Sequence, residues 1–136
     1  MRHKFIWPAL AVGLLAAGCG GTKHRALPVV SISERDFHIT VPHVVPAGEV
    51  RIVLKNKGPV SHELLIIHAA QGRLPRRADG FTIDENLVHS RLVGSFEPEG
   101  PSTRDLVLHL TRGRYVIFCN MAGHAASGML TSFQVR

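Results

Sequence analysis

One short stretch of the sequence, FCNMAGHAASGM, combines three residue types that bind soft metal ions. It contains Cys119, His124 and Met129, with four residues between each donor and the next. A thiolate and an imidazole bind copper strongly, and a thioether adds a weak axial contact. Because the three donors lie in and beside one short loop, they can face a single point. The stretch therefore predicts three of the four ligands of a copper site.

The fourth ligand must come from elsewhere in the chain, and His62 is the candidate. It follows the turn sequence NKGPVS and opens the apolar run HELLIIH. A β-sandwich brings this turn to the same end as the loop if the strands run appropriately. Two imidazoles, one thiolate and a distant thioether are the ligands of blue-copper electron-transfer centres. His68 lies roughly 20 Å further along the same extended run and cannot share the site.

The elements that must position these donors are short β-strands separated by Pro and Gly. Apolar and polar residues alternate, as in EVRIVLKN, where Val50, Ile52 and Leu54 share one face. Residues 70–90 lack this alternation, and we expect a long connection there with room for one helical turn near IDENLV. About seven strands in about 110 residues predict an all-β fold, an antiparallel sandwich. The expected strands are 29–41, 49–56, 62–68, 91–97, 103–110, 114–120 and 129–136.

The bulk composition excludes several classes of protein. A chain of 136 residues is long enough for one domain and too short for two, and 45% hydrophobic residues exclude a disordered chain. The formal charge of +6 is spread thinly, without a long run of Lys or Arg. We therefore expect a mildly basic, solvated surface and no nucleic-acid partner.

The first residues have the character of an export signal. Arg2 and Lys4 precede the apolar run FIWPALAVGLLAAG, which is too short to span a bilayer comfortably. The run ends in LAAGC, which resembles a bacterial lipobox with Cys19 as the lipidated residue. The alternative is an ordinary secretory signal in which Cys19 is incidental. We expect a signal peptide at 1–18, a lipidated tether at 19–28 and one domain at 29–136, anchored to a membrane on its periplasmic or extracellular side.

Export would leave Cys119 as the one thiol of the folded domain. It has no cysteine to pair with inside the chain, although exported domains usually pair their cysteines. A metal ion would occupy and protect such a thiol.

Two segments together resemble the cupredoxin family. PAGEVRIVLKNKGPVSHEL is similar to the family segment that holds the first histidine ligand. GRYVIFCNMAGHAASGM is similar to the segment that holds the other three ligands, with the loop spacing of rusticyanin and auracyanin. The resemblance covers roughly Val29 to Arg136. It implies a Greek-key sandwich, one type 1 copper ion, and His62, Cys119, His124 and Met129 as its ligands.

The resemblance also implies a function. The domain would shuttle single electrons between redox proteins such as a cytochrome, an oxidase or a reductase, acting as a monomer and not as an enzyme. His124 would be the electron port, inside an apolar patch formed by Met121, Ala122, Gly123, Ala125 and Ala126. Tyr115 would brace the ligand strand. The alternative is a copper chaperone or storage protein on the same scaffold.

Two further side chains could compete for the metal. Glu63 follows the first histidine and is either a neighbour of the ligands or, as in red-copper relatives, a ligand itself. Strand alternation turns Glu63 away from the face that carries His62. Met121 is a second thioether in the loop, but Met129 holds the family's axial position.

Overall fold

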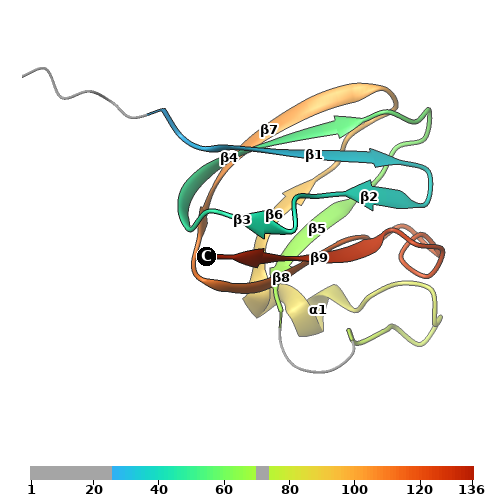
Figure 1. Cartoon of the computed structure of the whole chain (residues 1–136). Coiled ribbons are helices and arrows are strands. Elements are labelled where there is room, and N and C mark those ends of the chain that lie inside the picture. Colours follow the sequence, from blue (N-terminus) through green and yellow to red (C-terminus); the bar gives the residue numbers. More distant parts are fainter. Residues whose placement is uncertain (1–25, 70–73) are drawn as a thin grey trace, which may run out of the picture.

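The computed structural model describes residues 26–69 and 74–136, which form two β-sheets packed face to face (Figure 1). One sheet has the strand order β2-β1-β4-β7 and the other has the order β3-β9-β8-β5-β6. The expected all-β sandwich is confirmed. The strands are β1 (Val29–Arg35), β2 (His38–Thr40), β3 (Val44–Val45), β4 (Gly48–Asn56), β5 (Leu64–His68), β6 (Leu92–Phe96), β7 (Ser102–Leu110), β8 (Gly113–Cys119) and β9 (Leu130–Val135).

The strand count and the strand directions differ from the expectation. The predicted strand 29–41 is two strands, because the chain reverses at Asp36 and Phe37, where Phe37 adopts a left-handed φ of 62°. Residues 42–48, which lie between the first two expected strands, contain the two-residue strand β3. β1 pairs with β4 in parallel, as β3 does with β9, whereas the other pairs are antiparallel. The sheets are therefore mixed.

The core follows the alternation read from the sequence. Val50, Ile52 and Leu54 of β4 have no exposed surface. Leu108 and Leu110 of β7 are buried beside them, and β4 and β7 pair along nine residues. This packing joins β4 and β7 along their whole length.

Strand β8, which carries the expected ligand Cys119, is buried on both faces from Tyr115 to Cys119. Its inward residues join the main core, while Val116 and Phe118 join a second apolar cluster with Ile83 and Val88. The connection after β5 covers this outer face. It contains helix α1 (Glu85–Val88), capped by Asp84, and the 3-10 turn η1 (His89–Arg91). The expected helical turn is confirmed (Figure 1).

Tyr115 braces the ligand strand, as expected. Its ring is 1% exposed and stacks on Phe133 at a centroid distance of 5.4 Å. Its hydroxyl donates a hydrogen bond to the carbonyl of Thr111 at 3.0 Å and accepts one from the Thr111 backbone N–H at 3.1 Å. The start of β8 is thereby fixed to the turn that precedes it.

The ends of the described chain lie together at one end of the sandwich, and the loop between β8 and β9 lies at the other (Figure 1). No helix in the described parts of the chain is long and apolar enough to cross a membrane. The expected signal peptide, Cys19 and most of the expected tether lie outside the described residues.

Candidate metal centre

The loop between β8 and β9 is closed by its own backbone. The N–H of Cys119 donates to the carbonyl of Met129 at 2.9 Å, and the N–H of Met129 donates to the carbonyl of His124 at 3.0 Å. The N–H of His124 donates to the carbonyl of Met121 at 3.0 Å. Three of the expected ligands are therefore tied to one another through main-chain hydrogen bonds, which fixes their order around the loop.

His62 is held from the neighbouring strand. Leu64 of β5 pairs with Cys119 of β8, so the residue two positions earlier lies at the cysteine end of the sheet. The N–H of His62 donates to the carbonyl of Pro98 at 3.1 Å. The side chain of Asn56 shapes the preceding turn, since it donates to the carbonyl of Val60 at 2.7 Å and accepts from the N–H of Gly58 at 2.9 Å.

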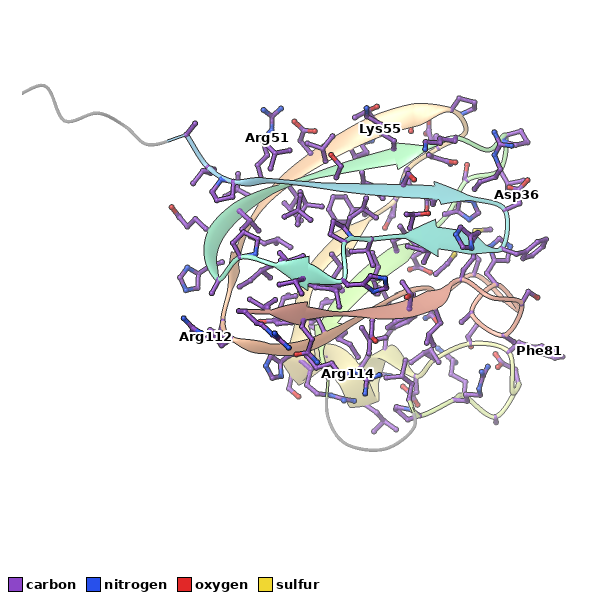
Figure 2. The ribbon with its side chains drawn as sticks, viewed as in Figure 1. Asp36, Arg51, Lys55, Phe81, Arg112 and Arg114 are labelled. Atoms are coloured by element: carbon purple, nitrogen blue, oxygen red, sulfur yellow. The ribbon has the colours of Figure 1, made fainter. Side chains whose placement is uncertain are left out.

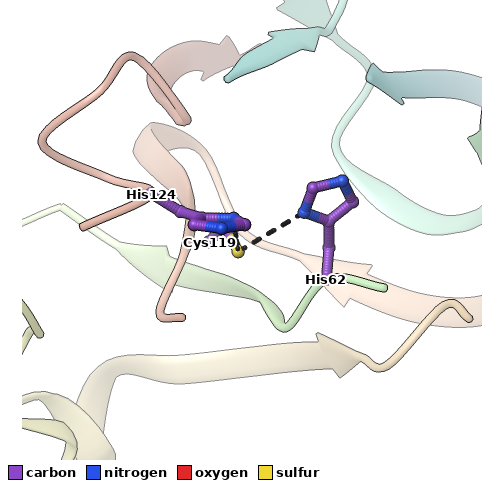
Figure 3. A group of neighbouring side chains, drawn as sticks. All are labelled: His62, Cys119 and His124. Atoms are coloured by element: carbon purple, nitrogen blue, oxygen red, sulfur yellow. Dashed lines mark hydrogen bonds between the residues drawn. The ribbon is translucent and has the colours of Figure 1, made fainter. Parts of the chain in front are cut away.

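The two imidazoles and the thiol converge on one point (Figure 3). The Nδ1 atoms of His62 and His124 lie 3.8 Å and 3.5 Å from the Sγ atom of Cys119. All three donor atoms lie within 4.8 Å of one another. A metal about 2.3 Å from sulfur and about 2.0 Å from nitrogen, in a trigonal plane, separates these donors by about 3.7 Å. The donor set therefore fits a trigonal metal ion.

Met129 lies directly beside these donors. It has no exposed surface and belongs to the same core cluster as Cys119. Its backbone hydrogen bonds join it to Cys119 and His124. Met121, by contrast, is 37% exposed. Burial in the ligand cluster favours Met129 as the axial donor.

Burial sets the protonation of the metal-free site. It raises the pKa of the Cys119 thiol, an effect that the backbone N–H groups of Glu63 and Met121 partly oppose. It lowers the pKa of His62, as does the nearby His124. The metal-free protein at neutral pH thus presents a thiol and a neutral imidazole at these two positions.

The turn between β1 and β2 also reaches the site, which the sequence did not indicate. The ring of Phe37 packs edge-on against His124 at a centroid distance of 5.5 Å, and Asp36 Oδ1 lies 3.9 Å from His62 Nε2. A Cβ atom at Gly128 would lie 2.6 Å from the carbonyl oxygen of Phe37. Only glycine therefore lets this turn approach the ligand loop so closely.

Asn120 is a second residue that the sequence reasoning missed. Its side chain accepts a hydrogen bond from the N–H of Ile83 at 2.7 Å and donates to the carbonyl of Ile83 at 3.1 Å and to Glu85 Oε1 at 2.6 Å. The connection after β5 is thus fastened to the residue after Cys119. The only signal available was the position of Asn120 directly beside a predicted ligand.

The remaining candidates fall outside the site. Glu63 is not among the donors that converge, and its carboxyl pKa is raised by burial and by the neighbouring carboxylates of Glu85 and Glu97. Ala125 is 8% exposed, so the expectation that it forms part of a surface patch is wrong. Its place in the turn of the loop directs it inward. Four further histidines are exposed and lie outside the donor group: His38, His43, His89 and His109.

The sequence and fold are similar to those of known copper proteins. A family model of the sulfocyanin (SoxE) domain matches residues 20–136. No curated protein sequence matches the chain significantly. Both findings concern the sequence alone.

Among solved structures, auracyanin from Roseiflexus castenholzii is 16% identical with a TM-score of 0.59, covering 82% of this chain and 99% of its own. Auracyanin A from Chloroflexus aurantiacus, a blue copper protein, is 17% identical with a TM-score of 0.58. The match covers 82% of this chain and 100% of auracyanin A. Rusticyanin from Thiobacillus ferrooxidans is 20% identical with a TM-score of 0.55. The match covers 82% of this chain and 79% of rusticyanin. The resemblance to this fold, read first from two sequence segments, is confirmed.

Proposed function

We propose that the chain carries single electrons between redox proteins, because it belongs to the sulfocyanin (SoxE) family of cupredoxins. Cupredoxins bind one type 1 copper ion, and His62, Cys119, His124 and Met129 would hold it in this chain. The observation that carries the proposal is the convergence of two imidazole Nδ1 atoms on one buried thiol sulfur. When bound, copper supplies a site that accepts and returns one electron.

The protein's contribution is to keep its donors in place in both oxidation states. The backbone hydrogen bonds of the loop hold Cys119, His124 and Met129, and the pairing of β5 with β8 places His62 at the same end, without help from the ion. Cys119 and Met129 have no exposed surface, so solvent is kept from the sulfur side. A site that does not rearrange lowers the activation free energy of electron transfer, because little solvent or protein must reorganise.

His124 is the proposed electron port. Of the three donors that come together, His124 is the one that is partly exposed. The ring of Phe37 packs edge-on against its imidazole. Exposed apolar side chains surround this end: Phe37 is 51% exposed, Phe81 is 60% exposed and Met121 is 37% exposed. The N–H of Gly123 donates to the carbonyl of Phe81 at 3.2 Å, which places Phe81 beside the loop.

These apolar side chains are the proposed docking surface. Figure 2 shows Asp36 and Phe81 at this end, opposite to Arg112. A small apolar contact with few charges suits brief encounters with a cytochrome, an oxidase or a reductase. We propose that the domain acts as a monomeric carrier and not as an enzyme. Among the described residues, one group of metal-ligating side chains comes together, which suits a carrier better than a multicopper enzyme.

The proposed location is outside the cytoplasm. The apolar N-terminal run and LAAGC support export with a lipid on Cys19, which would hold the domain at a membrane surface. Mass spectrometry of the mature protein tests this part separately. An unmodified N-terminus downstream of Cys19 would contradict the anchor and leave the copper centre unaffected.

The visible spectrum of the copper-loaded protein tests the centre. Oxidised protein is expected to show strong thiolate-to-copper charge transfer, and Cys119→Ser is expected to abolish it while the sandwich remains folded. A matched control, Ser127→Ala, changes an exposed residue of the same loop and is expected to keep the colour. A colourless Cu(II)-loaded wild type would overturn the assignment.

Copper retention separates the carrier from a chaperone. The exposed thioether of Met121 beside the loop is the feature that a copper-transfer protein would use. A carrier keeps its ion through repeated reduction and reoxidation in the presence of a modest chelator. Loss of copper at each reduction would favour the chaperone.

A further inference from the structure

Glu34 occupies a position on β1 where the alternation of the strand otherwise buries apolar side chains. β1 alternates so that Val30, Ile32 and Glu34 face the other sheet, with exposed fractions of 4%, 1% and 2%. On the neighbouring strands, Glu34 pairs with Ile39 and Asn56. A carboxyl group thus lies inside the sandwich, at the end of β1 that leads into the turn of Asp36 beside the metal centre.

The Glu34 carboxyl group has no compensating partner. Neither of its oxygen atoms has a hydrogen-bond partner among the described residues. The side-chain amide of Asn56 is engaged by Val60, Gly58 and Glu99. Carboxylates are almost never buried alone, because an ionised carboxylate loses its hydration when buried.

The charged groups of the surrounding elements do not neutralise Glu34. Arg35 and His38 are exposed, and Lys57 is exposed and contributes only its backbone N–H, which donates to the Glu34 carbonyl at 2.9 Å. The carboxylate of Asp36, in the turn after β1, lies near the ring of His62 and does not pair with a cation of β1. Burial alone raises the pKa of Glu34 to about 7.

Glu34 acts electrostatically on the proposed metal centre without belonging to it. Its carboxylate is not among the donor atoms that lie within 4.8 Å of one another. Its negative charge nevertheless helps to raise the pKa of the Cys119 thiol, so its field reaches the ligand sulfur. A negative charge at that range stabilises Cu(II) over Cu(I), because reduction removes one positive charge from the centre.

We propose that Glu34 couples electron transfer at the copper centre to the uptake and release of one proton. This inference rests on the proposed electron-transfer function. On reduction, one electron from the reduced partner protein converts Cu(II) to Cu(I), and one proton from solvent binds a Glu34 carboxylate oxygen. On oxidation, the electron leaves to the acceptor protein and the O–H bond of Glu34 breaks to return the proton to solvent.

The coupling has a definite sign. Ionised Glu34 favours Cu(II), so the reduction potential falls as pH rises through the range in which Glu34 loses its proton. With one proton per electron, each tenfold fall in proton concentration lowers the potential by at most 59 mV. Outside this range Glu34 has the same charge in both oxidation states, and its contribution to the slope disappears.

The test compares the potential between pH 5 and pH 9 in the copper-loaded wild type, in Glu34→Gln and in Glu49→Gln. Glu49 is an exposed carboxylate of β4 and serves as the control for loss of one negative charge. The wild type and Glu49→Gln are expected to show the falling region near pH 7, and Glu34→Gln is expected to lose it. A slope that survives in Glu34→Gln, or a wild-type potential that does not change with pH, would overturn the inference.

A second measurement needs no copper. The folded-state pKa of Glu34 lies above its value in the unfolded chain, so its ionisation costs stability as pH rises through about 7. The urea midpoint of metal-free wild type is therefore expected to fall between pH 5 and pH 8 relative to that of Glu34→Gln. Parallel midpoints would show that Glu34 does not titrate there and would overturn the inference. A colourless loaded protein would overturn the proposed function itself, whereas a blue protein with a flat potential would overturn the coupling alone.

Discussion

At the scale of single residues, we expect the thiol of Cys119 to set the number of protons released on metal binding. Burial raises its pKa above the ordinary value, so the metal-free protein carries the protonated thiol at pH 7. His62 is already neutral there, since its pKa is lowered. Metal binding requires the thiolate, so about one proton per ion must leave from Cys119.

Titration of metal-free protein with copper in a weakly buffered solution at pH 7 measures this release. About one proton per ion is expected from the wild type, and Cys119→Ser is expected to release almost none. If Cys119→Ser released as many protons per ion as the wild type, the thiol would not be a ligand.

Met129 is the residue expected to set the reduction potential. A thioether favours Cu(I), and a harder amide oxygen favours Cu(II). Met129→Gln is therefore expected to lower the potential while a changed colour persists, as measured by voltammetry and visible spectroscopy. Met121→Gln, in the exposed thioether of the same loop, is the matched control and should leave the potential unchanged. The opposite result would assign the axial position to Met121.

At the scale of elements, the ligand loop depends on a close approach to the turn between β1 and β2. Gly128 has a φ of 123°, and its missing Cβ leaves room for the carbonyl of Phe37. Gly128→Ala is expected to lower the free energy of unfolding by about 1–3 kcal/mol, since it adds both backbone strain and a collision. Denaturation of metal-free protein measures the loss.

Gly123→Ala provides the matched control. Gly123 has a φ of 81°, but a Cβ there would meet no atom within 4 Å. It is therefore expected to cost only the strain, about 1 kcal/mol. Equal losses in the two variants would show that the contact with Phe37 contributes nothing.

The proposed metal ligands could be identified from the sequence because their chemistry is local. Cys119, His124 and Met129 are recognisable from donor type and spacing, and His62 from its place between a turn and a strand. The core was predictable too, because Val50, Ile52 and Leu54 of β4 occupy alternate positions, as do Leu106, Leu108 and Leu110 of β7. The position of Glu34 follows from the same alternation in β1, although it was not singled out.

The turn at Asp36 and Phe37 could not be predicted, because a single left-handed residue reverses the chain without Gly or Pro to mark it. Its contacts with His62 and His124 join segments far apart in the sequence. The same holds for Asn120, whose hydrogen bonds reach Ile83 across 37 positions. Such contacts depend on tertiary packing, which the local pattern does not contain.

At the scale of the whole molecule, the proposed donors are held by neighbouring strands of one sheet and by the loop between β8 and β9, and not by the ion. We therefore expect the metal-free protein to be folded, with copper raising the midpoint of thermal unfolding only by mass action. Near-ultraviolet circular dichroism before and after removal of copper checks this. Loss of the tertiary signal on removal would mean that the ion organises the fold.

Both ends of the described chain lie at the end of the sandwich opposite to the ligand loop. β1 begins there, where the carbonyl of Pro28 accepts from the N–H of Arg51, and Arg136 ends there against Ala47. Anything joined to either end, whether a lipid, a linker or an electrode surface, would hold the domain by its far side and leave His124 facing outward. An electron arriving from the attached side would have to travel the length of β8, about 20 Å. Attachment would thus give the domain a polarity, favouring exchange with partners that approach from solution over exchange with the surface that carries it.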